Sequence, residues 1–383
     1  MSQQSKLKIG LVFDDSLDKP DGVQQYVLGI GAWLSSQGHE VHYLVGQTAR
    51  QDVPHIHSLS RNLRVSFNGN RLSIPLPASR RRLKALLDRE QYDVLHIQTP
   101  YSPWLAHRLI LAAGPRTAIF GTFHIVAYSK LVHFATRGLA WWTRRSSRHF
   151  DTLFSVSTAA QAYAMATYGL PSTVLSNVVD YQRFHAASPR QPRPVGLRIL
   201  FLGRLVPRKG CQVLLAAIAE LVATRPALLP FTVMICGKGP LMSSLKEYVR
   251  TSGIVDLVEF VGFVSEADKP SYYASADIAV FPSSGGESFG IVLIEAMASG
   301  HSAVLAGDNS GYRSVMGDRP ELIFDSKNVH GLAVKLETYL TDTPLRQAAA
   351  DWGEKYSQQF DTTVVGTQLV AAYKLALQKR RTR

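Results

Sequence analysis

The chain contains 383 residues, which at about 150 residues per domain predicts two domains. Apolar residues make up 46% and charged residues 19%, and the absence of a collagen repeat, a sustained heptad or a low-complexity tract excludes a fibrous or disordered chain. Lysine and arginine total 42 against 29 aspartates and glutamates, so the net charge of +13 predicts a polyanionic partner: nucleic acid, an anionic membrane or a phosphorylated substrate.

The two cysteines, Cys211 and Cys236, exclude a disulfide framework and a cysteine-rich zinc site, and they favour a reducing cytoplasm. The first apolar run, residues 9–13, is too short for the core of a signal peptide. No stretch approaches the ~18 uninterrupted apolar residues of a membrane span. Any attachment to a membrane is therefore expected to be peripheral.

Short apolar strands alternate with helical segments through the first half of the chain. Val23, Val27, Ile30 and Leu34 recur at the spacing of one helical face. The alternation predicts an α/β domain with a parallel sheet. The predicted strands are residues 8–13, 40–45, 94–98, 117–122 and 152–157.

A proline-rich segment, residues 186–194, predicts a linker, because it cannot form a helix interior or a central strand. A second strand–helix series follows, so the sequence predicts two doubly wound halves with ligands at the carboxyl ends of the strands. Residues 362–377 predict a last helix before a basic tail. The predicted strands of the second half are residues 198–203, 231–237, 258–263, 277–281 and 302–305.

The strongest functional signal is the segment 285–300, in which two glycine-rich turns bracket an apolar helix. A glycine-rich loop that enters a helix presents backbone N–H groups and the positive end of the helix dipole, which suits an anion or a polyhydroxyl ligand. Glu287 lies in this loop. Glu295 is a single carboxylate among apolar side chains, so it needs a partner, either a ligand or a structural cation.

A second signal follows the first strand of the second half. Gly203 and Arg204 end this strand, and Lys209 lies five residues after Arg204 at a helix entrance. Two cations at the end of a sheet suit a diphosphate. A solvated Arg-Lys loop is the alternative, and the neighbouring glycine-rich motif makes it the weaker one.

These two motifs, in this order and spacing, resemble the retaining enzymes of glycosyltransferase family 4, which have the α/β GT-B fold of two Rossmann-like domains facing each other across a cleft. The resemblance covers nearly the whole chain and is greatest to bacterial phosphatidylinositol α-mannosyltransferases. It implies an acceptor-binding domain over residues 1–190, joined by a returning helix at 362–383, and a nucleotide-sugar domain over residues 191–361. Three further stretches carry it: Pro20-Asp21-Gly22-Val23-Gln24, Phe67-Asn68-Gly69 and Gly121-Thr122-Phe123-His124.

The resemblance implies a role for each matching residue. Arg204 and Lys209 would bind the donor diphosphate and stabilise the charge on the departing nucleotide. Glu287 would bind sugar hydroxyls, and His124 would contact the sugar near the reacting carbon, which completes the predicted catalytic set. The predicted donor site is Gly22, Gly203, Arg204, Lys209, Val264, Glu266, Glu287, Ser288, Phe289, Gly290, Ile291 and Glu295, with Glu295 on the ribose.

The resemblance also implies an acceptor site, formed by Gln24, Asn68, Arg71 and Lys130. One departure is visible, because the first glycine of the family's N-terminal loop is Asp21 here. Gly22 still allows the loop to turn. A carboxylate near a diphosphate is unfavourable unless it points toward the acceptor, so this departure leaves the acceptor open.

Glu266 is expected to recognise the base of the donor nucleotide, because its carboxylate can accept hydrogen bonds from the N–H groups of guanine. The relatives place an acidic residue about one position earlier, where Ser265 stands. GDP-mannose is therefore the favoured donor, with UDP-sugars as the alternative. No tightly bound cofactor and no metal site is predicted, and assistance by a loosely held divalent cation stays open.

Two basic clusters in the first half predict contact with an anionic membrane. The alternative is an exposed basic helix beside a packed aromatic pair. The first cluster combines cations with an apolar face, and the second combines tryptophans with arginines. The predicted membrane surface is Arg80, Arg81, Arg82, Lys84, Trp141 and Trp142.

The sequence therefore predicts a monomeric hexosyltransferase, peripheral at the inner face of the cell membrane, that moves mannose from GDP-mannose onto a lipid such as phosphatidylinositol with retention of configuration. A UDP-sugar donor and a soluble or glycan acceptor are the alternatives within this class. A nucleic-acid-binding protein is disfavoured because the basic clusters are scattered. A non-catalytic polyanion-binding relative is disfavoured because Arg204, Lys209, Glu287 and Glu295 are all present.

Overall fold

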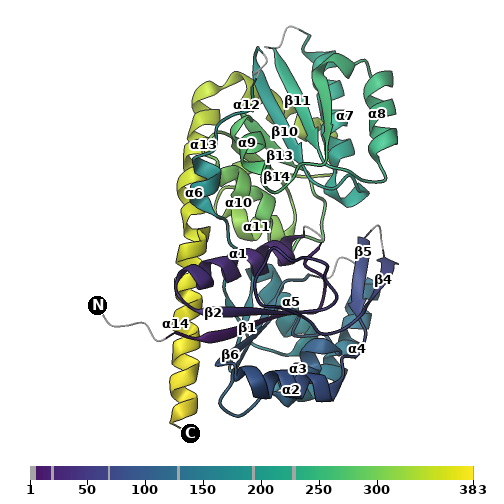
Figure 1. Cartoon of the computed structure of the whole chain (residues 1–383). Helices are drawn as coiled ribbons and strands as arrows, with labels where there is room; N and C mark the ends of the chain where they lie inside the picture. Colours follow the sequence, from purple (N-terminus) through teal and green to yellow (C-terminus); the bar gives the residue numbers. More distant parts are fainter. Residues whose placement is uncertain are drawn as a thin grey trace, which may run out of the picture. The chain divides into compact units, whose positions relative to one another are not determined.

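The computed structural model describes residues 6–18, 21–67, 70–126, 130–191, 195–226 and 230–382, and the chain divides into two compact units (Figure 1). Unit 1 comprises Met1–Val178 with Thr362–Arg383, and unit 2 comprises Val179–Asp361. The division falls twelve residues before the expected boundary at residue 190. Residues 179–190 belong to unit 2 because Val179 N–H donates to the Phe360 carbonyl at 2.9 Å and the ring of Phe184 packs on Tyr273.

Unit 1 contains a parallel sheet and a separate antiparallel hairpin. The sheet strands are β1 Lys8–Phe13, β2 Glu40–Val45, β3 Ile56–Ser58, β6 Val94–Ile97, β7 Ala118–Phe123, β8 Thr152–Ser155 and β9 Thr173–Val174. The hairpin strands are β4 Asn62–Phe67 and β5 Asn70–Pro75. The helices are α1 Gly22–Ser36, α2 Arg80–Glu90, α3 Leu105–Ala112, α4 Lys130–Ser147, α5 Thr158–Tyr168 and α14 Thr362–Arg381.

The two faces of this sheet are covered by different helices, because its strands are apolar on both sides. Ile9 and Leu11 of β1 belong to an apolar cluster with residues of α1 and α14. Val12 of the same strand packs instead with residues of α2 and α3. The alternating side chains of a strand thus hold helices on opposite faces of one sheet.

The C-terminal helix α14, yellow in Figure 1, packs on unit 1 although it follows unit 2 in the chain. Tyr373 is fully buried, and its hydroxyl lies 2.7 Å from His96 Nδ1 of β6. Gly366 lets α14 approach α1 closely, since a Cβ there would lie 2.4 Å from the ring of Trp33. Residues 362–383 therefore complete the core of the first unit.

Unit 2 contains a second parallel sheet. Its strands are β10 Leu197–Leu202, β11 Phe231–Cys236, β12 Val258–Gly262, β13 Ile278–Phe281, β14 Ala303–Gly307 and β15 Ile323–Phe324, and each strand predicted for this half overlaps one of them. The helices are α6 Tyr181–His185, α7 Cys211–Thr224, α8 Met242–Thr251, α9 Lys269–Ala274, α10 Ile291–Ala298, α11 Ser310–Met316, α12 Val329–Thr341 and α13 Thr343–Ser357.

Each sheet reverses its strand order at one position. In the described part of unit 1 the order is β3-β2-β1-β6-β7-β8-β9, and in that of unit 2 it is β12-β11-β10-β13-β14-β15. The chain therefore winds outward in both directions from β1 and β6 in unit 1, and from β10 and β13 in unit 2. Loops that leave the carboxyl ends of such strand pairs diverge, and ligands bind there in doubly wound folds.

Candidate functional site

Both motifs of the second half lie at the reversal point of the unit 2 sheet. The loop after β10 holds residues 203–210, the loop after β13 holds residues 282–290, and β10 and β13 are parallel neighbours. Ser284 N–H donates to the Arg208 carbonyl at 3.0 Å. Gly210 has a φ of +75°, and a Cβ on it would lie 2.1 Å from the Pro282 carbonyl oxygen. Glycine is therefore required where the two loops meet.

A buried carboxylate joins these loops. Glu287 Oε1 accepts hydrogen bonds from Arg208 Nη1 at 2.6 Å, Lys209 Nζ at 2.9 Å and Ser283 Oγ at 2.8 Å. The side chains of Lys209 and Glu287 are only 17% and 12% exposed. The structure thus brings together two predicted catalytic residues and adds Arg208, which the sequence analysis passed over although it stands beside Lys209.

The electrostatics of this cluster favour an anionic ligand. Burial alone would raise the pKa of Glu287, but Lys209 and Arg208 hold it below its ordinary value, so the carboxylate is ionised. Burial lowers the pKa of Lys209, and the contact with Glu287 opposes this effect. Two cations surround one carboxylate, and the predicted Arg204 lies exposed on the same loop. The excess positive charge at a strand end suits a diphosphate.

The loop 282–290 leads into α10, whose first N–H groups have no partner within the helix. Gly286 has a φ of +71° and Gly290 a φ of +133°. Gly311 supports the loop, because a Cβ there would lie 2.2 Å from the Glu287 carbonyl oxygen. Among the predicted donor residues here, Phe289 has its side chain buried against Phe360, so it can offer a ligand only its backbone.

Glu295 and Glu266, the residues predicted for ribose and base, share one lysine. Lys269 Nζ lies 3.2 Å from Glu295 Oε1 and 2.8 Å from Glu266 Oε1. Tyr273 donates its hydroxyl to Glu295 Oε2 at 2.9 Å. Glu295 is buried, whereas the side chain of Glu266 is 40% exposed. The predicted Val264, two residues before Glu266, is buried.

Lys269 and Tyr273 are thus the partners of the buried carboxylate of Glu295. Burial raises the pKa of Glu295. Burial would lower the pKa of Lys269, but the carboxylates of Glu295 and Glu266 raise it above its ordinary value. Lys269 is a charged residue that the sequence analysis missed, and its position three residues after Glu266 was the available signal.

His124 follows β7 in unit 1, next to the strands at the reversal point. Its Nε2 lies 2.9 Å from Gln98 Oε1, in the loop after β6, and its ring meets that of Tyr26 edge-on. Burial lowers the pKa of His124 to about 3, so the imidazole is neutral. Asp14, after β1, accepts from Ser102 Oγ, and burial raises the pKa of its carboxyl to about 6.

The N-terminal loop shows what Asp21 does in place of the family's glycine. Its Oδ1 accepts from the amides of Val23 and Gln24, both at 2.9 Å, so it is the N-cap of α1. Such a cap stabilises a helix by about 0.5–2 kcal/mol. The predicted Gly22 is exposed in the first turn. Gln24 is buried, and its Nε2 donates to the Leu17 carbonyl at 2.8 Å.

The other predicted acceptor residues are described in part or not at all. Asn68 lies outside the described residues. The backbones of Arg71 and Lys130 are placed in β5 and α4, but their side chains lie outside the described part of the chain.

The predicted basic helix is α2, and one part of that prediction is wrong. Leu83, Leu86 and Leu87 are buried in the core of unit 1, where they pack with α3, so they are not offered to a membrane. The cations of α2 remain exposed, and Lys84 pairs with Asp88. Among the described residues, no helix is both long and apolar enough to cross a bilayer.

A cavity of about 430 Å³ is lined by basic and aromatic residues of α2, α3, α4 and the segment before α3. Trp141 and Trp142 of α4 are 77% and 55% exposed, and the ring of Trp142 lies 6.1 Å from that of Trp104. The structure therefore brings the two predicted membrane clusters to one surface. The charged residues that line the cavity are Arg80, Lys84, Arg108 and Arg145.

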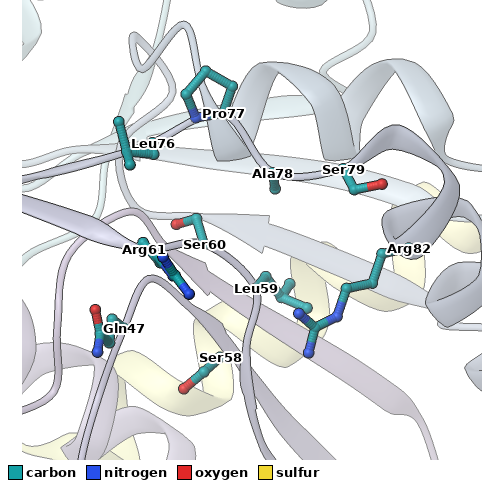
Figure 2. Close-up of a pocket in the computed structure, with 10 residues that line it drawn as sticks. All are labelled: Gln47, Ser58, Leu59, Ser60, Arg61, Leu76, Pro77, Ala78, Ser79 and Arg82. Carbon is teal, nitrogen blue, oxygen red and sulfur yellow. The ribbon is translucent and has the colours of Figure 1, made fainter.

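A second cavity in unit 1, of about 410 Å³, lies at the start of α2. Arg61, Arg82, Ser58 and Ser60 are among the residues that line it, and Figure 2 shows Leu59 between the two arginines. Two guanidinium groups and hydroxyls suit a small polar anion.

The comparisons with known proteins agree with this architecture. The family model Glycosyltransferase Family 4 matches residues 20–183, and the model Glycosyl transferases group 1 matches residues 190–356. The chain is 33% identical over 374 residues to the phosphatidyl-myo-inositol mannosyltransferase of Mycolicibacterium smegmatis, covering 96% of this chain and 93% of the relative.

A second relative is the GDP-mannose-dependent α-(1-6)-phosphatidylinositol monomannoside mannosyltransferase of Mycobacterium tuberculosis, which is 26% identical over 355 residues and covers 88% of this chain and 89% of its own. Among solved structures, sucrose-phosphate synthase from Thermosynechococcus elongatus superposes with a TM-score of 0.78 at 20% identity, covering 98% of this chain and 100% of that one.

The two doubly wound units and their likeness to that structure confirm the expected fold class, the GT-B fold. The chain belongs to glycosyltransferase family 4, as its motifs predicted.

The buried histidines of unit 1 predict a loss of stability in acid. The unfolded chain binds a proton at each histidine below its ordinary pKa of 6.5, whereas burial lowers the pKa of His96 and of His124 to about 3 in the folded state. The free energy of unfolding therefore decreases as the pH falls below about 6.5, by about 2 kcal/mol per histidine between pH 7 and pH 5. The thermal midpoint of His124→Gln should fall less over this range than that of the wild type.

The matched control is His149→Gln, since His149 is an exposed histidine of the same unit. It should lose as much stability in acid as the wild type. Parallel acid profiles of His124→Gln and the wild type would contradict the neutral, buried state of His124.

Proposed function

We propose that this protein transfers mannose from GDP-mannose to phosphatidylinositol with retention of anomeric configuration. The observation that carries the proposal is the similarity to a phosphatidyl-myo-inositol mannosyltransferase, which extends through both units and nearly the full length of both chains. The name of the second relative, GDP-mannose-dependent, supports the choice of donor. The site in unit 2 supports nucleotide-sugar chemistry independently, because a cluster rich in cations and backbone amides lies at the reversal of its sheet.

In the proposed reaction, Arg204 and Lys209 bind the diphosphate and neutralise the charge that develops on it as the sugar leaves. Lys209 exchanges part of its contact with Glu287 for the diphosphate. Glu287, kept ionised by Arg208, accepts hydrogen bonds from hydroxyls of the transferred sugar. The backbone amides of Ser288, Phe289 and Gly290 hold the sugar and phosphate in the loop before α10.

The acceptor hydroxyl attacks the anomeric carbon on the side of the leaving group. The bond from that carbon to the diphosphate oxygen breaks as the new glycosidic bond forms, and the hydroxyl proton passes to a diphosphate oxygen. His124, neutral and held by Gln98, is proposed to accept or donate a hydrogen bond to the sugar near this carbon. Gly22 lets the N-terminal loop approach the diphosphate.

The guanine and ribose of the donor are assigned to the lysine-bridged carboxylates. Glu295 binds the ribose hydroxyls, and Glu266 accepts from the guanine N–H groups with Lys269 between them. At the position where the relatives carry an acid, Ser265 donates its hydroxyl to Asp268 Oδ2 at 2.6 Å. Asp268 therefore supplies a carboxylate beside Ser265, the position at which the relatives carry an acidic residue.

The acceptor side is proposed to act at a membrane surface. Arg80 and Lys84 of α2 line one cavity with the exposed Trp142 of α4, so positive charge and an amphipathic ring lie together at this surface. Attachment is peripheral, at the inner face of the cell membrane, with Gln24, Asn68, Arg71 and Lys130 as the proposed acceptor contacts. The protein acts as a monomer, without a tightly bound cofactor.

The transfer assay is the direct test of this function. Purified protein is given radiolabelled GDP-mannose or UDP-glucose, each with phosphatidylinositol in mixed micelles or with free inositol. We expect label in the lipid phase with GDP-mannose and phosphatidylinositol only. Label from UDP-glucose would overturn the donor, and label in free inositol would overturn the lipid acceptor.

Donor affinity tests the role of Lys209. Lys209→Ala removes one charge-assisted contact, which should weaken GDP binding by about 10- to 150-fold, from about 1.5–3 kcal/mol. Arg208 and Ser283 still pair with Glu287, so the fold should persist. Lys246→Ala removes an exposed lysine of α8 in the same unit and should leave the affinity unchanged in calorimetry. Wild-type affinity in Lys209→Ala would contradict the diphosphate assignment.

Vesicle binding tests the membrane surface. Each cation near an anionic surface contributes about 1 kcal/mol, so replacing Arg80, Arg81, Arg82 and Lys84 with Ser should reduce partitioning by up to about 1,000-fold. Binding should also weaken as salt rises. The matched control replaces four exposed cations of unit 2, Lys246, Arg250, Lys327 and Lys355, with Ser. Equal co-sedimentation of both variants, or equal binding to neutral and anionic vesicles, would remove this surface from the proposal.

A further inference from the structure

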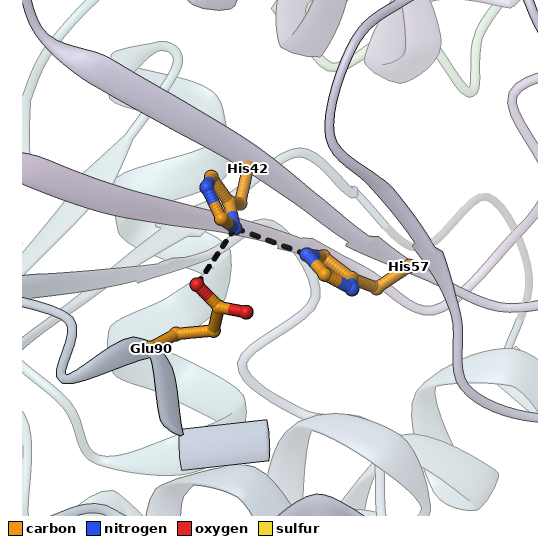
Figure 3. Close-up of side chains that lie close together, drawn as sticks. All are labelled: His42, His57 and Glu90. Atoms are coloured by element: carbon orange, nitrogen blue, oxygen red, sulfur yellow. Dashed lines mark hydrogen bonds and ion pairs between the residues drawn. The ribbon is translucent and has the colours of Figure 1, made fainter. Parts of the chain in front are cut away.

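Three side chains with metal-ligand atoms meet at the edge of the unit 1 sheet (Figure 3). His57 lies on β3 opposite Leu44 of β2, and His42 lies two residues before Leu44, so both imidazoles share one face of the sheet. Glu90 is the last residue of α2. One ligand atom from each of the three lies within 4.8 Å of the other two.

Hydrogen bonds define which nitrogen of His42 faces this cluster. Its Nε2 lies 3.2 Å from Glu40 Oε1, and an ionised carboxylate can only accept, so Nε2 carries the proton. The lone pair is then on Nδ1, which lies 3.0 Å from His57 Nε2, 2.9 Å from the Tyr92 hydroxyl and 3.9 Å from Glu90 Oε2. His42 thus presents its basic nitrogen to two further ligand atoms.

We propose that His42, His57 and Glu90 form a site for a divalent transition-metal ion such as zinc. Tetrahedral zinc with bonds of about 2.0–2.1 Å places its ligand atoms about 3.3 Å apart, a value that lies between the 3.0 Å and 3.9 Å found here. Two imidazoles with one carboxylate select zinc, copper, nickel or cobalt over magnesium and calcium. Glu40 orients His42 as carboxylates orient metal-bound histidines.

The Tyr92 hydroxyl or a water completes the coordination. A bound ion would join β2, the edge strand β3 and the last turn of α2, the helix that carries the cations of the proposed membrane surface. The site is therefore structural and separate from the residues assigned to the donor. The sequence alone predicts no metal site, because the three ligands come from three elements and form no recognisable spacing.

Lys8 competes with the proposed metal ion for the carboxylate of Glu90. Its Nζ lies 2.6 Å from Glu90 Oε2 and 2.9 Å from Glu40 Oε1, so its ammonium supplies the positive charge in the metal-free form. A metal ion and this ammonium compete for the same carboxylates. Removing Lys8 should therefore tighten metal binding, which a purely structural ion-pair network does not predict.

The test uses untagged full-length protein freed of metal with a chelator. Zn²⁺ is titrated by calorimetry, and Co²⁺ is followed by its visible absorption, which reports tetrahedral ligation. We expect one ion per chain and a higher thermal midpoint with Zn²⁺. Changes to outer partners of metal sites already cost about 10–100-fold in affinity, so His57→Ala and Glu90→Gln should each cost at least about tenfold.

The matched control is His330→Ala, which removes an exposed histidine paired with Glu220 in unit 2 and should leave the affinity unchanged. Lys8→Met should bind Zn²⁺ more tightly than the wild type. The proposal is overturned by the absence of Zn²⁺ and Co²⁺ binding in the wild type, or by equal affinity in His57→Ala. If Glu90→Gln fails to fold, His57→Ala and Lys8→Met decide the question, since His57 is only partly buried.

Discussion

The ion-paired carboxylate of Glu287 is the constraint on which the candidate donor site depends. Two loops separated by about eighty residues meet there, and the charge on Glu287 is tolerated in a largely buried position because Arg208, Lys209 and Ser283 all contact one of its oxygens. Removing one partner of a buried pair is more costly than the pair is stabilising. The cluster therefore fixes both loops in the arrangement that the proposed chemistry requires.

A second buried cluster of ion pairs lies farther along the chain in unit 2. Lys269 is buried between Glu295 and Glu266, so the residues assigned to ribose and base are held together before a nucleotide binds. Cations positioned by carboxylates cost little reorganisation when a ligand arrives, which is the basis of electrostatic preorganisation. In unit 1 the equivalent strand ends carry a neutral imidazole, His124 held by Gln98, and a buried carboxyl group, Asp14 held by Ser102.

Much of this arrangement could be predicted from local sequence. The apolar runs identified the central strands of both sheets, and the glycine-rich motifs identified the loops at one reversal point, because strand periodicity and backbone freedom are properties of short segments. Family resemblance then assigned the fold and the enzyme class. The short strands β3, β9 and β15 were not predicted, since segments of two or three residues carry no periodicity. The β4–β5 pair was also not predicted, although apolar and polar residues alternate in both strands.

Side-chain partners were the part that the sequence could not supply. Arg208 and Lys269 look like ordinary charged residues until the fold brings Glu287 and Glu295 against them. The apolar face of α2 has the same pattern whether it packs on a core or on a membrane, and the structure places Leu83 in the core. Asp21 was unfavourable as a departure from the family's loop, yet it is favourable as the N-cap of α1.

The most direct test of the central claim is a crystal structure of the protein with GDP-mannose bound. The account predicts the diphosphate against Lys209 and Arg204, with hydroxyls of the mannose on Glu287 and the ribose on Glu295. A diphosphate held elsewhere, with Lys209 and Glu287 paired as they are here and contacting no ligand, would contradict it.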